Sequence, residues 1–437
     1  MDFHALSGMR DYIGSAREDL SHLVSEANDV FGSAGYRQIE TPVLEDARLF
    51  DRSLGEETDI VSKEMYTIEQ SGDRIIAMRP ENTAGVARAV IENDLMAQRN
   101  QLKLNYAGSM FRHERPQSGR QREFHQVGVE LFGRSDPFAD AEVIQLGQEY
   151  LRRVDVESPV LLLNSIGCPK CRPGYLEDLT EILEEHREEL CENCQRRIDT
   201  NPLRVLDCKN ETCQSIYQTH VPSILEALCE DCDEHFDRVK GHLDRMGIEF
   251  ELDPFLVRGL DYYRRTAFEF VAGDLGSQDA VLAGGRYDGL VEELGGDHTP
   301  AVGFAAGLER LMILRGTHET DDVDARADCY VVSFDDETLS ELLPVVTELR
   351  RQSFPGSDRP VRVEVGNPDD SVKSQFRRAD RYNARAVFLM GEDERSEGVL
   401  NVKRMDTGEQ KSFEFEGNDM LVQSLLTLLD DIDPSEI

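Results

Sequence analysis

Apolar and polar positions alternate with different periods along the chain, and these periods predict its secondary structure. Apolar residues recur at helical spacing over 15–34, up to a glycine at position 35. Further helices are predicted over 137–153 and 305–315. Strand-like alternation marks five segments, namely 74–79, 102–111, 124–132, 159–163 and 267–271. Because these strands come in runs with few helices between them, we expect a mostly antiparallel sheet flanked by helices.

The last quarter of the chain has a different pattern, in which strands and helices alternate. The predicted order is strand 329–334, helix 336–352, strand 361–365, helix 369–382 and strand 385–390, then two more strands and a terminal helix. An acidic, polar stretch at 321–328 precedes it and suits a linker. The alternation predicts a separate small α/β domain with a mixed sheet.

Composition indicates a folded, polar protein. Of 437 residues, 39% are apolar and 7% aromatic, and apolar runs recur throughout, which excludes a disordered chain. No apolar run approaches the roughly 20 residues that a membrane span needs, and the N-terminus has no basic-then-apolar signal pattern. We therefore expect a soluble, cytoplasmic protein.

The charge is strongly acidic, with 86 acidic against 48 basic side chains and a formal charge of −38. Only 8 of the basic residues are lysine. Acid enrichment with lysine depletion fits a halophile-like proteome, because repulsion is screened within about 3 Å at 1 M salt and acidic surfaces stay soluble. The net charge therefore indicates habitat, and a local cluster of arginines can still bind phosphate.

Eight of the nine cysteines lie in a short block and come in close pairs. In a reducing cytosol such pairs mark a tetrahedral metal site more often than disulfides, so eight thiolates predict up to two structural zinc sites. The alternative is a set of free thiols, and the spacing leaves open which pairs share an ion. We expect this block to lie away from the substrate motifs. The candidate ligands are Cys168, Cys171, Cys191, Cys194, Cys208, Cys213, Cys229 and Cys232.

The stretch FRHERPQSGRQREFHQVGVE (111–130) has two predicted strands around an arginine-rich loop. Guanidinium groups meet phosphate oxygens bidentately, so this hairpin is a candidate polyphosphate clamp; the alternative is a solvated turn. On the returning strand Gln126 and Glu130 share one face, which suits either a small polar ligand or solvent. The arginines of the loop are Arg112, Arg115, Arg120 and Arg122.

Three further clusters carry candidate chemistry. In RPENT (79–83), Glu81 is suited to hold an ammonium group or to cap the following helix. In LVRGLDYY (256–263), Arg258 next to a glycine suits close approach to phosphate, whereas the two tyrosines alone are most often packing residues. In AVGFAAGLER (301–310), Arg310 follows small residues and suits a nucleotide, or is a surface charge.

Taken together, these segments resemble a known family. The order of YRQIETPVLED, a strand interrupted by Pro42, then FRHERP…EFHQVGVELFG and GLERL is similar to motifs 1, 2 and 3 of class II aminoacyl-tRNA synthetases. RPENTA, LVRGLDYY and AGGRYDGL resemble the histidyl-tRNA synthetases specifically, as do NPLRVLDCK and KSQFRRADRYNARAVFLMGEDE. Two departures are Asn82, where glycine or methionine is frequent, and the eight cysteines, which only part of the family has.

The resemblance implies an α+β fold: a class II catalytic domain on a six-stranded antiparallel sheet, a helical Cys-rich insertion and a C-terminal α/β anticodon-binding domain. The implied boundaries are 1–167 and 247–320 for the core, 168–246 for the insertion and 326–437 for the last domain. It also implies a homodimer that uses ATP with Mg²⁺ to join L-histidine to tRNA(His) through histidyl-adenylate, releasing AMP and pyrophosphate.

The resemblance also implies roles for individual residues. Arg112 would contact the α-phosphate and the substrate carboxylate, and Arg258 would stabilise charge that develops on the α-phosphate. Arg120 and Arg310 would contact the outer phosphates. The implied histidine-binding residues are Glu81, Asn82, Thr83, Gln126, Glu130, Tyr262 and Tyr263.

Two other functions compete with this one. The synthetase-like regulatory subunit of ATP phosphoribosyltransferase keeps the fold but typically lacks the anticodon domain and several site motifs, all of which this chain has. A class II synthetase for another amino acid shares segments of the RPE type. RGLDYY and the position of Glu130 disfavour that third possibility.

Overall fold

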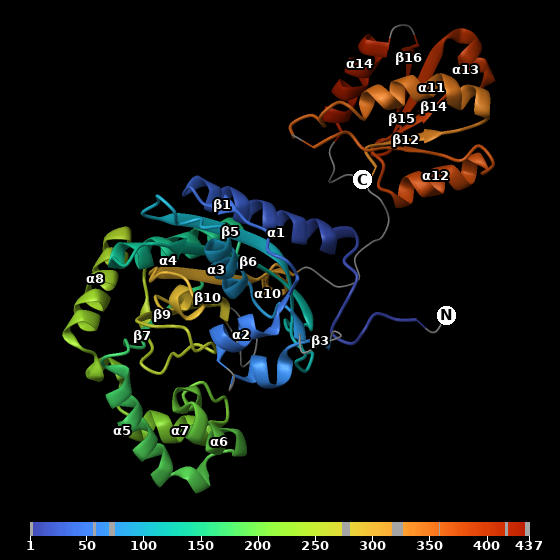
Figure 1. The fold of residues 1–437 in the computed structure, drawn as a ribbon. Helices are drawn as coiled ribbons and strands as arrows, with labels where there is room; N and C mark the ends of the chain where they lie inside the picture. The colour runs from blue at the N-terminus through green and yellow to red at the C-terminus, as the bar shows by residue number, and fades with distance from the viewer. Residues whose placement is uncertain are drawn as a thin grey trace. The chain divides into compact units, whose positions relative to one another are not determined.

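The computed structural model describes residues 3–55, 58–69, 75–272, 280–316, 327–357, 359–415 and 418–432. The chain divides into two compact units, Met1–Thr320 and Asp321–Ile437, and each is described by itself (Figure 1). Among the described residues no helix is long and apolar enough to cross a bilayer.

The N-terminal unit is built on an eight-stranded sheet, in which the six inner strands pair antiparallel as expected. Two outer strands of two residues each add parallel pairs that the sequence did not predict. In spatial order the strands are β1 (Arg37–Gln38), β5 (Leu102–Phe111), β6 (Glu123–Phe132), β11 (Ala301–Gly307), β10 (Ala280–Arg286), β9 (Thr266–Val271), β7 (Val160–Ser165) and β8 (Glu251–Leu252).

The sheet separates two apolar cores, because successive side chains of a strand point to opposite faces. On β6, Val127, Val129 and Leu131 enter the core shared with helices α1 (Gly14–Ser33), α4 (Pro137–Arg153) and α10 (Leu308–Leu314). On β5, Leu104 and Tyr106 enter the opposite core, to which α2 (Ala47–Leu54) and α3 (Thr83–Glu92) contribute. A small sheet of β2 (Leu44–Asp46), β4 (Ile75–Met78) and β3 (Thr67–Glu69) borders this second side.

Two sequence-based elements differ from the structure, and one strand was not predicted. Pro42 separates β1 from β2, and the two strands belong to different sheets. The helix predicted from residue 305 begins only at Leu308, because AVGFAAG forms strand β11. The Gly-rich segment before Tyr287 is also a strand, β10. Alanine and glycine have weak strand propensity, but here Gly284 and Gly303 let the two central strands approach closely.

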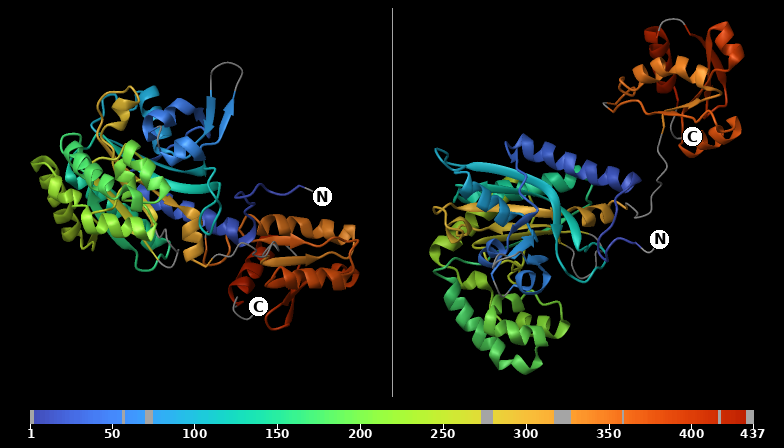
Figure 2. Two further views of the ribbon diagram at one scale, coloured as in Figure 1. Left: turned by 90° about the horizontal axis from the view of Figure 1, so that it is seen from below. Right: turned by 45° about the vertical axis from the view of Figure 1, so that its right-hand side comes forward.

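The insertion is helical, as predicted. Helices α5 (Arg172–Glu185), α6 (Glu192–Thr200) and α7 (Glu211–His220) form a lobe on the side of the sheet opposite α1, and α8 (Glu230–Met246) returns along α4 (Figures 1 and 2). At this return His235 on α8 lies 2.7 Å from the buried carboxylate of Asp140 on α4, which also accepts from Thr266 on β9 at 2.6 Å. Arg286 on β10 completes this buried contact to Asp140.

The C-terminal unit has a mixed five-stranded sheet. Strand β12 pairs parallel with two neighbours, and the remaining pairs are antiparallel, in the order β13 (Val363–Val365), β12 (Cys329–Val332), β14 (Ala386–Leu389), β15 (Val399–Arg404) and β16 (Gln410–Glu414). Helices α11 (Asp336–Leu349) and α14 (Asn418–Asp430) pack on one face, and α12 (Val372–Arg381) packs on the other. The short helix α13 (Glu392–Glu397) was not predicted.

Candidate active site

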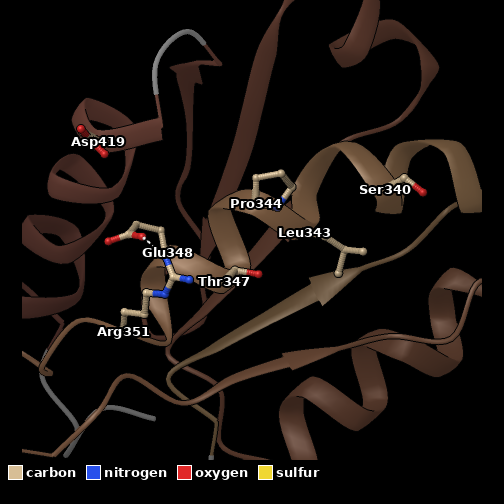
Figure 3. A pocket seen from close by; sticks show the side chains of 7 residues that line it. All are labelled: Ser340, Leu343, Pro344, Thr347, Glu348, Arg351 and Asp419. Carbon is tan, nitrogen blue, oxygen red and sulfur yellow. Dashed lines mark hydrogen bonds and ion pairs between the residues drawn. The ribbon is translucent and has the colours of Figure 1, made fainter.

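Two cavities merit comparison. One, of about 490 Å³, lies on the outer side of α11 beside Asp419 of α14, and Figure 3 shows a single side-chain ion pair in it, between Glu348 and Arg351. The other, of about 580 Å³, lies in the N-terminal unit where the β5–β6 hairpin, strands β10 and β11, the segment 253–263 and the insertion meet. The second gathers most of the sequence-predicted site residues.

The lining of this cavity is rich in arginine. Arg112 donates from Nε to the carbonyl of Pro80 at 2.9 Å, and Arg120 donates to Glu114 at 2.9 Å. Arg310, at the first turn of α10, donates to the carbonyl of Ala280. Burial, and then the positive charge of Arg120, lowers the pKa of Arg310. Neighbouring positive charges repel each other, and an anion bound between them relieves this repulsion.

Arg258 lines the same cavity and is held in place by its neighbours. It forms an ion pair with Glu269 on β9, and its guanidinium lies 5.5 Å from the ring centre of Tyr263. Burial is the largest single effect and lowers the pKa of Arg258, but the charges of Glu269, Tyr263 and Tyr262 together outweigh it, so the net shift is upward. Within the described part of the chain its buried Nε has no hydrogen-bond partner. This donor is available to a ligand.

Two buried carboxyl groups, Glu81 and Glu130, belong to the same region, and of these two Glu81 is among the cavity-lining residues and Glu130 lies behind Thr83. Glu81 accepts hydrogen bonds from the backbone N–H groups of Thr83 and Ala84 at 2.7 and 2.9 Å, so it caps helix α3 and also lines the cavity. Thr83 donates from its hydroxyl to Glu130 at 2.7 Å, and Tyr287 donates to the other oxygen of Glu130. A Cβ atom on the neighbouring Gly303 would collide with that carboxylate.

The environment of Glu130 favours its neutral form. Burial raises the pKa of Glu130 to about 8, even though the hydrogen bonds from Tyr287 and Thr83 lower it. Burial likewise raises the pKa of Glu81. These two buried carboxyl groups are therefore stabilised by a cationic or hydrogen-bond-donating partner.

The remaining predicted residues divide into two kinds. Gln126, Tyr262 and Tyr263 line the cavity, and the Oε1 atom of Gln126 has no partner among the described residues. Asn82 is not among the lining residues. Its Oδ1 atom accepts from the hydroxyl of Thr41 at 2.5 Å and lies 3.4 Å from Nη1 of Arg79, so it ties the start of α3 to the preceding strands.

Sequence reasoning assigned no role to two residues that the structure places at the site. Tyr287 bonds Glu130, and Glu269 pairs with Arg258. A signal for Glu269 was present, because it is the one charged residue inside the apolar strand AFEFV. Tyr287 belongs to the segment AGGRYDGL, but only the fold brings it to Glu130.

The eight paired cysteines form two groups, and in each group the four sulfur atoms lie within 4.8 Å of one another. The first and last pairs form the outer thiol group: Cys168, Cys171, Cys229 and Cys232. The middle pairs form the inner thiol group: Cys191, Cys194, Cys208 and Cys213. The pairing that the spacing left open is thereby defined.

The sulfur positions fit a tetrahedral ion. A zinc–sulfur bond of about 2.3 Å places the sulfurs of a regular tetrahedron about 3.8 Å apart, and the Sγ atoms of Cys168 and Cys229, and of Cys191 and Cys208, are 3.8 Å apart. Burial and then its thiol neighbours Cys208 and Cys191 raise the pKa of Cys194 above the usual range, so a cation is needed for all four to be thiolates.

The inner thiol group is not remote from the cavity, and on this point the sequence-based expectation is wrong. Residues on either side of its ligands, among them Asp207, Lys209 and Gln214, line the cavity. Linear distance from the substrate motifs was a poor guide, because the lobe of α5–α7 packs back against the segment 253–263.

Comparison with known proteins gives concordant matches. Residues 8–311 match the family model for histidyl-tRNA synthetase, and residues 328–423 match the anticodon binding domain. The histidine–tRNA ligase of Geobacter sulfurreducens is 43% identical over 405 residues, covering 93% of this chain and 95% of that protein. That of Maridesulfovibrio salexigens is 44% identical over 411 residues, with 93% and 97% covered.

Solved structures agree with these matches. The apo histidyl-tRNA synthetase of S. aureus superposes with a TM-score of 0.77 at 30% identity, covering 97% of this chain and all of that one. A Bacillus halodurans structure described as an ATP phosphoribosyltransferase regulatory subunit/histidyl-tRNA synthetase has a TM-score of 0.62 at 19% identity, with 86% and 96% covered, which shows a shared fold alone.

Proposed function

This chain belongs to the histidyl-tRNA synthetase family, and we propose that it joins L-histidine to tRNA(His) at the cavity of its N-terminal unit. One observation carries the proposal: a single cavity is lined by four arginines and by the buried carboxylate of Glu81, and Thr83 in its wall is hydrogen-bonded to the buried Glu130. Triphosphate suits the arginines, and an amino acid with a cationic amine and an N–H-bearing ring suits the two carboxyl groups.

In the proposed first step, a carboxylate oxygen of histidine attacks the α-phosphorus of ATP, the bond to the β-phosphate breaks, and pyrophosphate leaves. Arg112 orients the α-phosphate and the carboxylate, and Arg258 offers its free Nε to the charge that builds up there. Arg120 and Arg310 hold the outer phosphates. Mg²⁺, when bound with ATP, neutralises phosphate charge.

In the second step, the terminal ribose hydroxyl of tRNA attacks the histidyl carbonyl carbon and loses its proton, and AMP leaves. In both steps the amine and the imidazole ring of histidine must be held in place. We assign the amine to Glu81 and Thr83 with Gln126, and the imidazole to Glu130 with Tyr262 and Tyr263. Among the described residues each oxygen of Glu81 accepts one backbone N–H, so each keeps a lone pair for an ammonium donor.

The regulatory-subunit function is disfavoured by the same features. A subunit that only regulates has no need of four cavity arginines or of an anticodon-binding unit, which matches here over residues 328–423. The test is amino-acid-dependent exchange of pyrophosphate into ATP, run with each of the twenty amino acids in high-salt buffer. Exchange with histidine alone supports the ligase; exchange with none supports the regulatory function, and exchange with another amino acid contradicts both.

Three further parts belong to this proposal. A zinc ion in each thiol group is supported by the sulfur spacing and by backbone N–H donors to sulfur, from Lys170 to Cys168 at 3.4 Å and from Asn210 to Cys208 at 3.5 Å. A homodimer and a cytoplasmic location are implied by family membership. Metal analysis of the purified chain and its mass in solution check the first two.

A further inference from the structure

The wall of the catalytic cavity is partly built by the inner thiol group. Cys208 stands between Asp207 and Lys209, and Cys213 immediately precedes Gln214; all three neighbours line the cavity. Two of the four thiols therefore lie on the same stretches of backbone as these side chains. Tyr217, one turn further along α7, also lines the cavity and packs on Phe255 with ring centres 5.2 Å apart.

The same wall is hydrogen-bonded to the segment that carries Arg258. Arg204, four residues before Cys208, donates from Nη1 to the carbonyl of Gly259 at 2.9 Å. Asn201 donates from Nδ2 to Asp261 at 2.7 Å. Cys208 donates its backbone N–H to the carbonyl of Val205 at 3.0 Å, and the residue before Val205, Arg204, makes the bond to Gly259, which follows Arg258.

The local secondary structure is too short to hold this wall alone. Helices α6 and α7 have 9 and 10 residues, and the segment Pro202–Val205 between them is a single turn of 3-10 helix. Isolated helices below about 12 residues are marginal in water. A cross-link between α6, the following loop and α7 supplies the missing rigidity, and the four thiols occur at those three places.

We propose that a zinc ion bound by the inner thiol group is a positioning element of the catalytic site, which holds the cavity wall and, through Arg204, the backbone beside Arg258. The outer thiol group reaches the site through Arg172, which follows Cys171 and donates to the carbonyl of Tyr263 at 2.6 Å, but none of its cysteines is next to a cavity-lining residue. It closes the base of the insertion, where Cys168 and Cys229 meet. The inference rests on the proposed function and extends it.

The test compares one variant from each thiol group, Cys213→Ser and Cys229→Ser. Each should lower the zinc content of the purified chain from two ions to one. Cys213→Ser should reduce kcat of histidine-dependent exchange by about tenfold or more, the size of effect typical when the residues supporting a site are removed. Hydrogen–deuterium exchange should rise in 203–218 and in 255–263. Cys229→Ser should keep kcat within about threefold, since its ligands do not form the wall.

Two further variants separate positioning from general damage. Cys213→His keeps a zinc ligand and should restore the second ion and most of kcat. Arg204→Ala keeps all eight thiols and both ions, and should lower kcat while leaving KM for histidine nearly unchanged. Should Cys213→Ser fail to fold, Arg204→Ala and Cys213→His still decide the question.

Several results would overturn the inference: full kcat in Cys213→Ser with one ion lost, equal losses in the two serine variants, or unchanged exchange at 255–263. If the wild-type chain activates no amino acid, the proposed function fails instead. Zinc content and hydrogen–deuterium exchange would then still report whether the inner ion orders the wall.

Discussion

Arginine plays two different parts in the two units of this chain. In the N-terminal unit Arg258 and Arg310 line a cavity, and the pKa of Arg310 is lowered by burial and by the charge of Arg120. In the C-terminal unit Arg377 on α12 lies on the surface side of its helix, and Arg378 pairs with Asp370 at 2.9 Å. Arginines that are buried and lie close together indicate a candidate phosphate site, whereas exposed arginines paired with acidic residues indicate a charged surface. The number of arginines does not distinguish the two.

The largest effect that can break this comparison is expected at Arg258. Arg258→Ala should lower histidine-dependent exchange by a factor of about 10² or more, because in the proposed mechanism it removes a preorganised charge contact to the transition state. Arg264→Ala is the matched control, since Arg264 lies six residues further along and pairs with Glu293 at the surface. Its rate should stay close to wild type.

The measurement is pyrophosphate exchange together with the melting temperature of both variants. Arg258→Ala leaves the half-buried Glu269 without its partner, so some loss of stability is expected. A near-normal kcat in a folded Arg258→Ala chain would mean that the cavity arginines do not act as assigned.

A second, smaller effect concerns the buried carboxyl of Glu130. Its pKa in the folded chain, about 8, is above the ordinary glutamate value, so it contributes stability that is complete below about pH 4.5 and lost as pH rises toward 8. Relative to Glu130→Gln, the wild type should lose up to about 1.4 kcal/mol of unfolding free energy per pH unit in that window.

The matched control is a carboxylate of the C-terminal unit. Backbone N–H groups, its own and that of Gly391, lower the pKa of Glu394, so its contribution is lost only as pH falls below the ordinary glutamate range. Denaturant unfolding of Glu394→Gln against wild type should show a difference that is flat between about pH 5 and 8. A flat difference for Glu130→Gln as well would show that burial does not favour its protonated form.

The smallest effect is expected on tRNA binding by the C-terminal unit. A chain of charge −38 has no long-range attraction for RNA, so binding depends on local arginines such as Arg377 and Arg381 on α12. Changing both to alanine should make the salt dependence of tRNA affinity shallower, by roughly 0.7 in logarithmic slope for each phosphate that the variant no longer binds. Arg395→Ala, which removes a surface pair to Glu337, is the control.

The salt slope is measured by filter binding or anisotropy from moderate to high salt. Readout by stacking and base-edge contacts predicts that wild-type binding persists at high salt. Equal slopes and affinities for wild type and the double variant would mean that the arginines of α12 are solvated surface residues that do not contact tRNA. Arg385, which follows α12 in the sequence, packs over Phe354 at 4.6 Å and serves the fold of its own unit.

The alternation of apolar and polar residues predicted those strands whose ranges depend only on local sequence. The hairpin strands β5 and β6 match their predicted ranges almost to the residue, because alternation over ten residues is set by one buried face. Strand β11 was mistaken for the start of a helix, since its glycines are explained only by neighbouring strands. Asn82 was placed with the substrate by resemblance, whereas its contacts are with Thr41 and Arg79.

Properties that depend on tertiary structure could not be predicted in the same way. Spacing indicated four cysteine pairs but not the nesting of the middle pairs inside the outer ones. The pairing of Glu269 with Arg258 joins two segments whose separation of eleven residues matches no helical or strand rule. The cysteine grouping and this ion pair are contacts of the tertiary structure, so local sequence patterns do not predict them.

The outer thiol group also has a consequence for the order of folding. Strands β7 and β9 pair directly, although about 100 residues separate them along the chain. An ion that first joins Cys168 to Cys229, 61 positions apart, shortens the loop that this pairing must close to about 40 residues. Loop-closure entropy then opposes the pairing less, by about 0.8 kcal/mol. Metal uptake during synthesis would therefore let β7 pair with β9 after the two ends of the insertion have already been joined.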